Sequence, residues 1–155
     1  MADTLRRVLP LGAVAVAFGT VAVTSAHADD LGAAVYAAVN QVRPCTFSND
    51  DARLSAAAQR HADDMLRNGV DGHTGSDGSS PQGRIADAGY GQTAGSGEIV
   101  YWGTGALATP AAALDLWMKS PGHRSIILNC AFTAGGFATA SDGNKMTAVG
   151  DFTAS

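Results

Sequence analysis

The feature that most constrains the fold is a break in an apolar helical segment near the end of the chain. Pro121 disfavours the helical conformation for Ser120, and Gly122 adopts backbone angles that other residues avoid. Trp117 precedes the break, and His123 follows it at once, ahead of an Ile-Ile-Leu run. The pattern places an imidazole on a stiff corner between two apolar anchors. His123 is therefore either a site residue or a residue that only caps the break.

The first 28 residues have the pattern of a secretory signal peptide. Arg6-Arg7 give a positive start, residues 8–24 are mostly apolar, and Ala26-His27-Ala28 fits the small-x-small cleavage rule. The apolar run is short for a membrane helix of about 20 residues, and it meets the cleavage site directly. We favour a signal peptide over a membrane anchor, and we expect one secreted, monomeric domain over residues 29–155 with no membrane span.

The charge balance argues against some partners. The chain has ten Lys and Arg residues against fourteen Asp and Glu, which gives a formal net charge of −4. The basic residues are dispersed, so neither a stripe for nucleic acid nor a polybasic patch for anionic lipid is present. We therefore expect no nucleic-acid partner.

Two cysteines, Cys45 and Cys130, are present. In an exported chain the favoured interpretation is one disulfide, which would join the end of the first helix to the segment after His123. A catalytic thiol is the weaker alternative, because neither cysteine lies beside a histidine or in a nucleophile motif. Two free thiols remain a third possibility.

Apolar spacing and capping signals predict the order of the elements. Helices are predicted over residues 31–43, 52–68 and 84–88, and from Thr109-Pro110 onward. Strand-like segments are predicted over residues 97–102, 132–140 and 145–152, the last two joined by a hairpin at 141–144. This order predicts an α+β fold in which helices flank a small, mostly antiparallel sheet.

Three more residues are candidates for a functional or packing role. His61 lies on the apolar stripe of the second helix, which favours a packing histidine over a site residue. His73 lies in the glycine-rich loop of residues 70–83 and is a second site candidate. Glu98 is the only glutamate, among thirteen aspartates, and stands at the mouth of an apolar run. It is either a charge at a strand edge or a carboxylate partner for a histidine or a metal.

Taken together, several segments resemble, in the right order, a CAP domain. This is the superfamily of cysteine-rich secretory proteins, antigen 5 and plant pathogenesis-related 1 proteins, here in a short bacterial form. The most specific match is Trp117-Met118-x-Ser120-Pro121-Gly122-His123-Arg124-x-x-Ile127-Leu128. The other matching segments are Asn40-Gln41-Val42-Arg43, Leu54-Ser55-x-x-Ala58-x-x-His61-Ala62-x-x-Met65, His73-Thr74-Gly75-x-Asp77-Gly78, Arg84-Ile85-x-x-Ala88-Gly89-Tyr90, Gly97-Glu98-Ile99 and Gly150-Asp151-Phe152.

The resemblance implies an α-β-α sandwich with a central cleft. In the family this cleft carries two histidines and two acidic residues, which can hold a divalent metal such as zinc. His73, Glu98 and His123 match three of the four, and two imidazoles with one carboxylate would leave an open coordination position. Ser120 stands where the family has its second carboxylate, and Ile99 replaces the asparagine that follows Glu98.

The resemblance implies extracellular recognition, and we favour a non-enzymatic binding module. Its ligand would be a lipid or sterol, a cell-wall fragment or a protein, and an apolar groove could be lined by Tyr101, Trp102 and Trp117. Of these three residues, Trp117 is expected in the core.

Two enzymatic alternatives remain. In a zinc hydrolase or protease, the metal would activate water while Ser120 or Glu98 assists proton transfer. A cell-wall glycosidase would pair Glu98 with Asp71 or Asp77, but no glycosidase motif surrounds these residues.

Overall fold

A computed structural model describes residues 24–47, 49–91 and 93–154 of the chain. Residues 1–23, most of the predicted signal peptide, lie outside the described residues. Within the described part, we find no helix with the length and apolar character needed to cross a membrane.

A four-stranded sheet forms the middle layer of the molecule. Its strands are β1 (Asn49–Asp50), β2 (Gly95–Thr104), β3 (Ala134–Ser141) and β4 (Lys145–Ala154), in the spatial order β1-β3-β4-β2. β1 is parallel to β3, whereas β4 pairs antiparallel with both β3 and β2. β2 is therefore an edge strand, and this position is what makes it available to a site.

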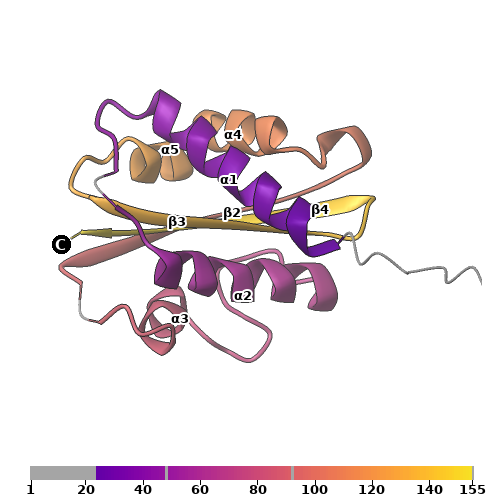
Figure 1. The fold of residues 1–155 in the computed structure, drawn as a ribbon, viewed down its shortest axis with the longest axis horizontal. Coiled ribbons are helices and arrows are strands. Elements are labelled where there is room, and N and C mark those ends of the chain that lie inside the picture. Colours follow the sequence, from indigo (N-terminus) through magenta and orange to yellow (C-terminus); the bar gives the residue numbers. More distant parts are fainter. Residues whose placement is uncertain (1–23, 48, 92, 155) are drawn as a thin grey trace, which may run out of the picture.

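Helices cover both faces of this sheet (Figure 1). α1 (Thr24–Val42), α4 (Pro110–Lys119) and α5 (Pro121–Ile127) lie on one face, and α2 (Ala52–Asn68) and α3 (Pro81–Asp87) lie on the other. A short 3₁₀ turn, η1 (Gly105–Leu107), follows β2. The predicted α+β class and the α-β-α sandwich are confirmed.

The second helix forms where capping and periodicity predicted it. The Asp51 side chain accepts a hydrogen bond from the backbone N–H of Arg53, and Gly69 ends the helix with a φ of 70°. The predicted apolar stripe, His61 included, is buried against the sheet. A helix with one apolar face is stable here because that face is removed from water.

Alternation along β2 divides its side chains between the two layers. Ile99 and Tyr101 join the core under α1 and α4, together with the fully buried Trp117. Val100 points to the opposite face and packs with α2 residues such as Ala62. The same period-two alternation places Glu98 on the α2 face of the sheet.

The observed elements differ from the predicted ones in several places. α1 begins at Thr24 rather than at residue 31, and Val42, predicted to be on its apolar face, is 37% exposed. α3 begins at Pro81 instead of residue 84, because Ser80 caps it and proline suits the first helical position. The segment after Ser120 is a short helix, α5, which also starts with a proline. The two-residue strand β1 and the turn η1 were not predicted.

The predicted disulfide between Cys45 and Cys130 is confirmed, and it joins the loop after α1 to the loop after α5. Arg43, from the N-x-x-R motif, reinforces this junction. Its buried guanidinium donates hydrogen bonds to the backbone oxygens of Ile127 and Phe132 and lies 4.0 Å from the centre of the Phe47 ring. The end of α5 is therefore held to α1 by one covalent and several polar contacts.

Candidate functional site

The candidate site lies at the edge of the sheet, where the two helical layers meet beside β2. His73 comes from the loop after α2, on one side of the sheet, and His123 comes from α5, on the other side. The centres of their rings are 6.4 Å apart. The structure thus brings together two histidines that are far apart in the sequence, beside Glu98 of β2.

Glu98 is the centre of this group. Its side chain is 1% exposed, and each carboxylate oxygen has its own donor. His73 Nδ1 donates to Oε1 at 2.8 Å, and Arg84 Nη2 donates to Oε2 at 2.6 Å. The prediction that Glu98 partners a histidine is confirmed for His73, and the alternative of an exposed edge charge is wrong.

Arg84 is a member of the site that sequence reasoning missed. Its side chain is 1% exposed, and besides Glu98 it binds the backbone oxygens of His73 and Ser79, at 3.0 and 2.9 Å. It therefore fixes the start and the end of the loop that carries His73. The available signal was an arginine inside the matched Arg84-Ile85-x-x-Ala88-Gly89-Tyr90 segment, where a lone cation in a short helix needs a partner if it is buried.

The loop between α2 and α3 is also held from below by α2. His61 Nε2 contacts the backbone oxygen of Gly72 at 2.8 Å, just before His73. Asp64 accepts from the backbone N–H of Ser76 at 2.7 Å. His61 is fully buried, as expected for a packing histidine, and it additionally anchors the loop.

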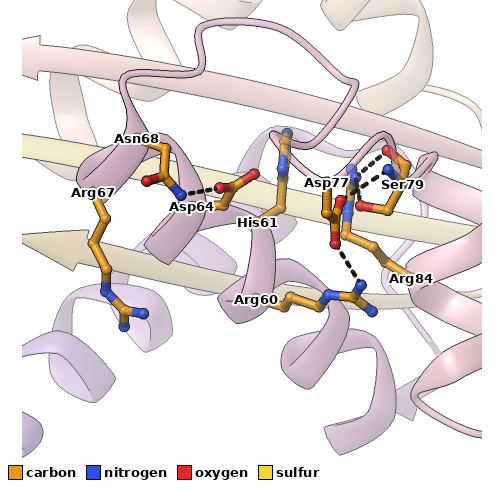
Figure 2. A pocket seen from close by; sticks show the side chains of 8 residues that line it. All are labelled: Arg60, His61, Asp64, Arg67, Asn68, Asp77, Ser79 and Arg84. Carbon is orange, nitrogen blue, oxygen red and sulfur yellow. Dashed lines mark hydrogen bonds and ion pairs between the residues drawn. The ribbon is translucent and has the colours of Figure 1, made fainter.

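A small polar cavity of about 160 Å³ opens between α2 and this loop. Figure 2 shows Arg60 reaching across it to Asp77, and Asp77 in turn contacting Ser79. Asp77 is engaged in holding the loop and does not approach Glu98 with a hydrogen bond. A pairing of Glu98 with Asp77 for glycoside hydrolysis therefore has no support in these contacts.

The break at Ser120 places His123. Ser120 has extended backbone angles (φ −86°, ψ 117°) and joins α4 to α5. Pro121 then starts α5, so that His123 lies in its first turn. Ser120 itself makes no side-chain capping hydrogen bond, and Asp115, the nearby carboxylate on α4, forms a surface ion pair with Lys119. Neither supplies the missing second acid.

A second buried acid comes instead from β4. Asp151 lies directly opposite Glu98 in the β2–β4 register, is 0% exposed, and has no hydrogen-bond partner for either side-chain oxygen among the described residues. Burial, and then the negative charge of Glu98, raise the pKa of Asp151 well above its ordinary value. Asp151 was quoted only as part of the terminal strand motif, because its position opposite Glu98 depends on strand register.

The two histidines have opposite electrostatic environments. The hydrogen bond to Glu98 raises the pKa of His73 above its ordinary 6.5, whereas burial and the charge of His73 lower the pKa of His123. A raised pKa in the folded state gives His73 a stabilising contribution below pH of about 6.5, and this is lost as pH rises through the raised value. His123 has the opposite sign, and its burial costs stability as pH falls below about 6.5.

We expect a pH titration of the histidine ring protons by NMR to show this order, with His73 titrating above His123. In a Glu98→Gln variant the pKa of His73 should fall, because the neutral amide no longer favours the charged imidazolium. The pKa of His123 should not fall with it, since the only charged neighbour that lowers it is His73. A wild-type protein in which His73 titrates below His123 would contradict this account.

The residues present do not fit a divalent metal ligated by His73, Glu98 and His123. Both oxygens of Glu98 already accept hydrogen bonds from nitrogen, one of them from the permanently charged Arg84. A carboxylate ligand needs a free lone pair directed at the metal, and Glu98 directs none toward the gap between the imidazoles. We therefore derive no chemical step through a metal.

An open groove of about 410 Å³ adjoins His123. It is lined by apolar and aromatic side chains of β2, η1 and α4, including Trp102, Leu107 and Leu116, with Asp71 and His123 as polar groups. Trp102 is half exposed, whereas Trp117 is fully buried. Of the three predicted groove residues, Trp102 and Tyr101 line the groove, and Trp117 belongs to the core, as expected.

Comparison with known proteins identifies the family. A family model described as the cysteine-rich secretory protein family, CAP, matches residues 36–152. The chain belongs to this family, which confirms the resemblance found in its motifs. No curated protein sequence matches the chain.

Two solved structures share the fold. One is an outer surface protein from Borrelia burgdorferi, with a TM-score of 0.67 and 21% identity over 79% of this chain and 90% of that chain. The other is an extracellular protein containing an SCP domain from Bacillus anthracis, with a TM-score of 0.68 and 20% identity over 83% of this chain. The second match spans 41% of the Bacillus chain.

Proposed function

We propose that this chain is an extracellular binding module whose groove beside His123 holds a small amphipathic molecule of the fatty-acid or sterol kind. The observation that carries the proposal is the clustering of exposed apolar side chains. Among the described residues, four large hydrophobic side chains are exposed, and three of them, Trp102, Leu107 and Leu116, line this one groove. Scattered exposed apolar residues are ordinary, but a cluster in a concavity indicates a binding surface.

The groove has the dimensions and composition of a small-molecule site. Its volume of about 410 Å³ lies within the usual range for ligand pockets, which are mainly apolar with a few polar groups that orient the ligand. Here the apolar wall would take a hydrocarbon body, and His123 and Asp71 would take a polar head group. The half-exposed ring of Trp102 offers the largest single contact area.

The extracellular location rests on several features together. The chain begins with a predicted signal peptide, it has a disulfide, and its structural neighbours are described as an outer surface protein and an extracellular protein. A hydrolytic role has weaker support, because Glu98 is fully engaged and Asp151 is buried out of reach of a substrate. Binding without catalysis is the simpler account.

A Trp102→Ala variant tests this proposal. We expect it to weaken binding of a fluorescent fatty acid or a fluorescent sterol by about tenfold or more, because a central aromatic contact contributes most to such a site. The matched control is Val42→Ala, which removes an exposed apolar side chain outside the groove and should leave affinity unchanged. Binding should be measured by fluorescence titration of both probes.

Two results would contradict the proposal. The first is saturable binding of a probe that Trp102→Ala and Val42→Ala leave equally intact, since the ligand would then lie elsewhere. The second is the absence of saturable binding of either probe to the folded wild-type protein.

A further inference from the structure

The structure points to a cation that is already part of the His/Glu centre. We propose that Arg84 is the resident cation of this centre, filling the charge role that a divalent metal would have and closing Glu98 to direct metal ligation. This inference is independent of the groove and of its ligand. It follows from how the guanidinium is held, what it contacts, and which acids surround it.

The guanidinium of Arg84 is fixed from two sides. Nη2 is 2.6 Å from Glu98 Oε2 and also donates to the backbone oxygen of His73. Nη1 donates to the backbone oxygen of Ser79 at 2.9 Å and to its hydroxyl at 3.2 Å. Because each of these acceptors belongs to the loop or the strand that frames the site, Arg84 cannot turn away without releasing the His73 loop.

Electrostatics then favours Arg84 over a metal ion. Arginine remains charged in proteins, so the positive charge beside Glu98 does not depend on pH in the ordinary range. A divalent ion that bound Glu98 would have to displace an N–H donor and approach a buried positive charge. Repulsion between like charges a few ångströms apart is stronger in such a buried site than in water, because the effective dielectric constant is lower.

The acids around Arg84 indicate what its removal would do. Glu98 and Asp151 are neighbours across the β2–β4 pair, and both are buried. Without Arg84, two carboxyl groups and the imidazoles of His73 and His123 would lie around a centre with no fixed cation. Two imidazoles and carboxylate oxygens are the ligand types that zinc prefers. Removal of Arg84 should therefore convert the centre into a metal site.

The test is a calorimetric titration of zinc ions alone into the metal-free protein. We compare the wild type with Arg84→Met, which removes the charge but keeps a side chain of similar length. The matched control is Arg60→Met, because Arg60 contacts the same loop through Asp77 but makes no contact with Glu98. Near-ultraviolet circular dichroism establishes that each variant is folded.

We expect Arg84→Met to bind zinc at least about tenfold more tightly than either the wild type or Arg60→Met, since a repulsive charge has been removed. Adding His73→Ala to Arg84→Met should abolish the gain. A folded Arg84→Met variant with no gain in zinc affinity would overturn the proposal.

The wild type provides a second, independent arm in case Arg84→Met does not fold. Stoichiometric zinc binding to the wild type that is lost in Glu98→Gln would show that Glu98 is a ligand despite Arg84, and would overturn the proposal. Wild-type protein that shows no such Glu98-dependent binding supports it. Arg84→Gln, which is neutral but can still donate to Glu98 and Ser79, gives the gain-of-binding comparison in a less disruptive form.

Discussion

Replacing Trp117 by alanine is expected to lower the free energy of unfolding by about 3–5 kcal/mol, the usual cost of truncating a large aromatic side chain in a core. Trp117 is fully buried in the layer between α4 and the sheet. Its indole Nε1 donates to the backbone oxygen of Val100 at 2.8 Å, and its ring meets Tyr101 edge-on with centres 6.2 Å apart. The alanine variant loses this packing and leaves a buried carbonyl without its donor.

Chemical denaturation followed by far-ultraviolet circular dichroism measures this effect. Trp117→Phe should cost less than Trp117→Ala, because it keeps most of the ring and loses mainly the hydrogen bond to Val100. Trp102→Ala is the matched control, since Trp102 is half exposed, and its cost should stay within about 0.5 kcal/mol. Equal costs for Trp117→Ala and Trp102→Ala would contradict the assignment of Trp117 to the core.

Removing the disulfide should have the second large effect. We expect Cys45→Ser/Cys130→Ser to lower the free energy of unfolding by about 2–5 kcal/mol. The cross-link joins residues 85 positions apart, and it restricts the unfolded chain strongly because the loop it closes is long. Arg43 still binds the backbone around α5 in this variant, so the native fold should persist at a lower stability.

Denaturation in the presence and absence of a thiol reductant measures this effect. The reductant should destabilise the wild type by about as much as the double substitution does, and it should leave the double variant unchanged. A double variant as stable as the wild type would mean that the disulfide contributes nothing beyond the polar contacts of Arg43.

These two anchors explain how the site is held at a sheet edge. The disulfide and Arg43 fix the end of α5, and thereby the side from which His123 approaches. His61 and Arg84 fix the loop that presents His73 from the other side. The two halves meet only at Glu98 and at the rings of the histidines. An edge strand permits this arrangement, because neither layer has to cross the sheet.

The sequence by itself determined the local elements and the order of the site residues. Backbone chemistry at Pro121 separates two helices at Ser120, and Asp51 and Gly69 bound α2, because these effects act within a few residues. The alternation along the last two strands and the turn between them predicted the hairpin for the same reason. Spaced motifs led to the family and to His73 and His123, which the structure then brings close together.

Only the tertiary structure decided what surrounds these residues. Asp151 lies opposite Glu98 because of the strand register, and Arg84 points at Glu98 because α3 packs beside β2. The groove likewise combines Trp102, Leu107 and Leu116 from three different elements. The physical reason is the same in each case: contacts between residues far apart in the chain depend on how whole elements pack, and side-chain periodicity within one element carries no information about its neighbour.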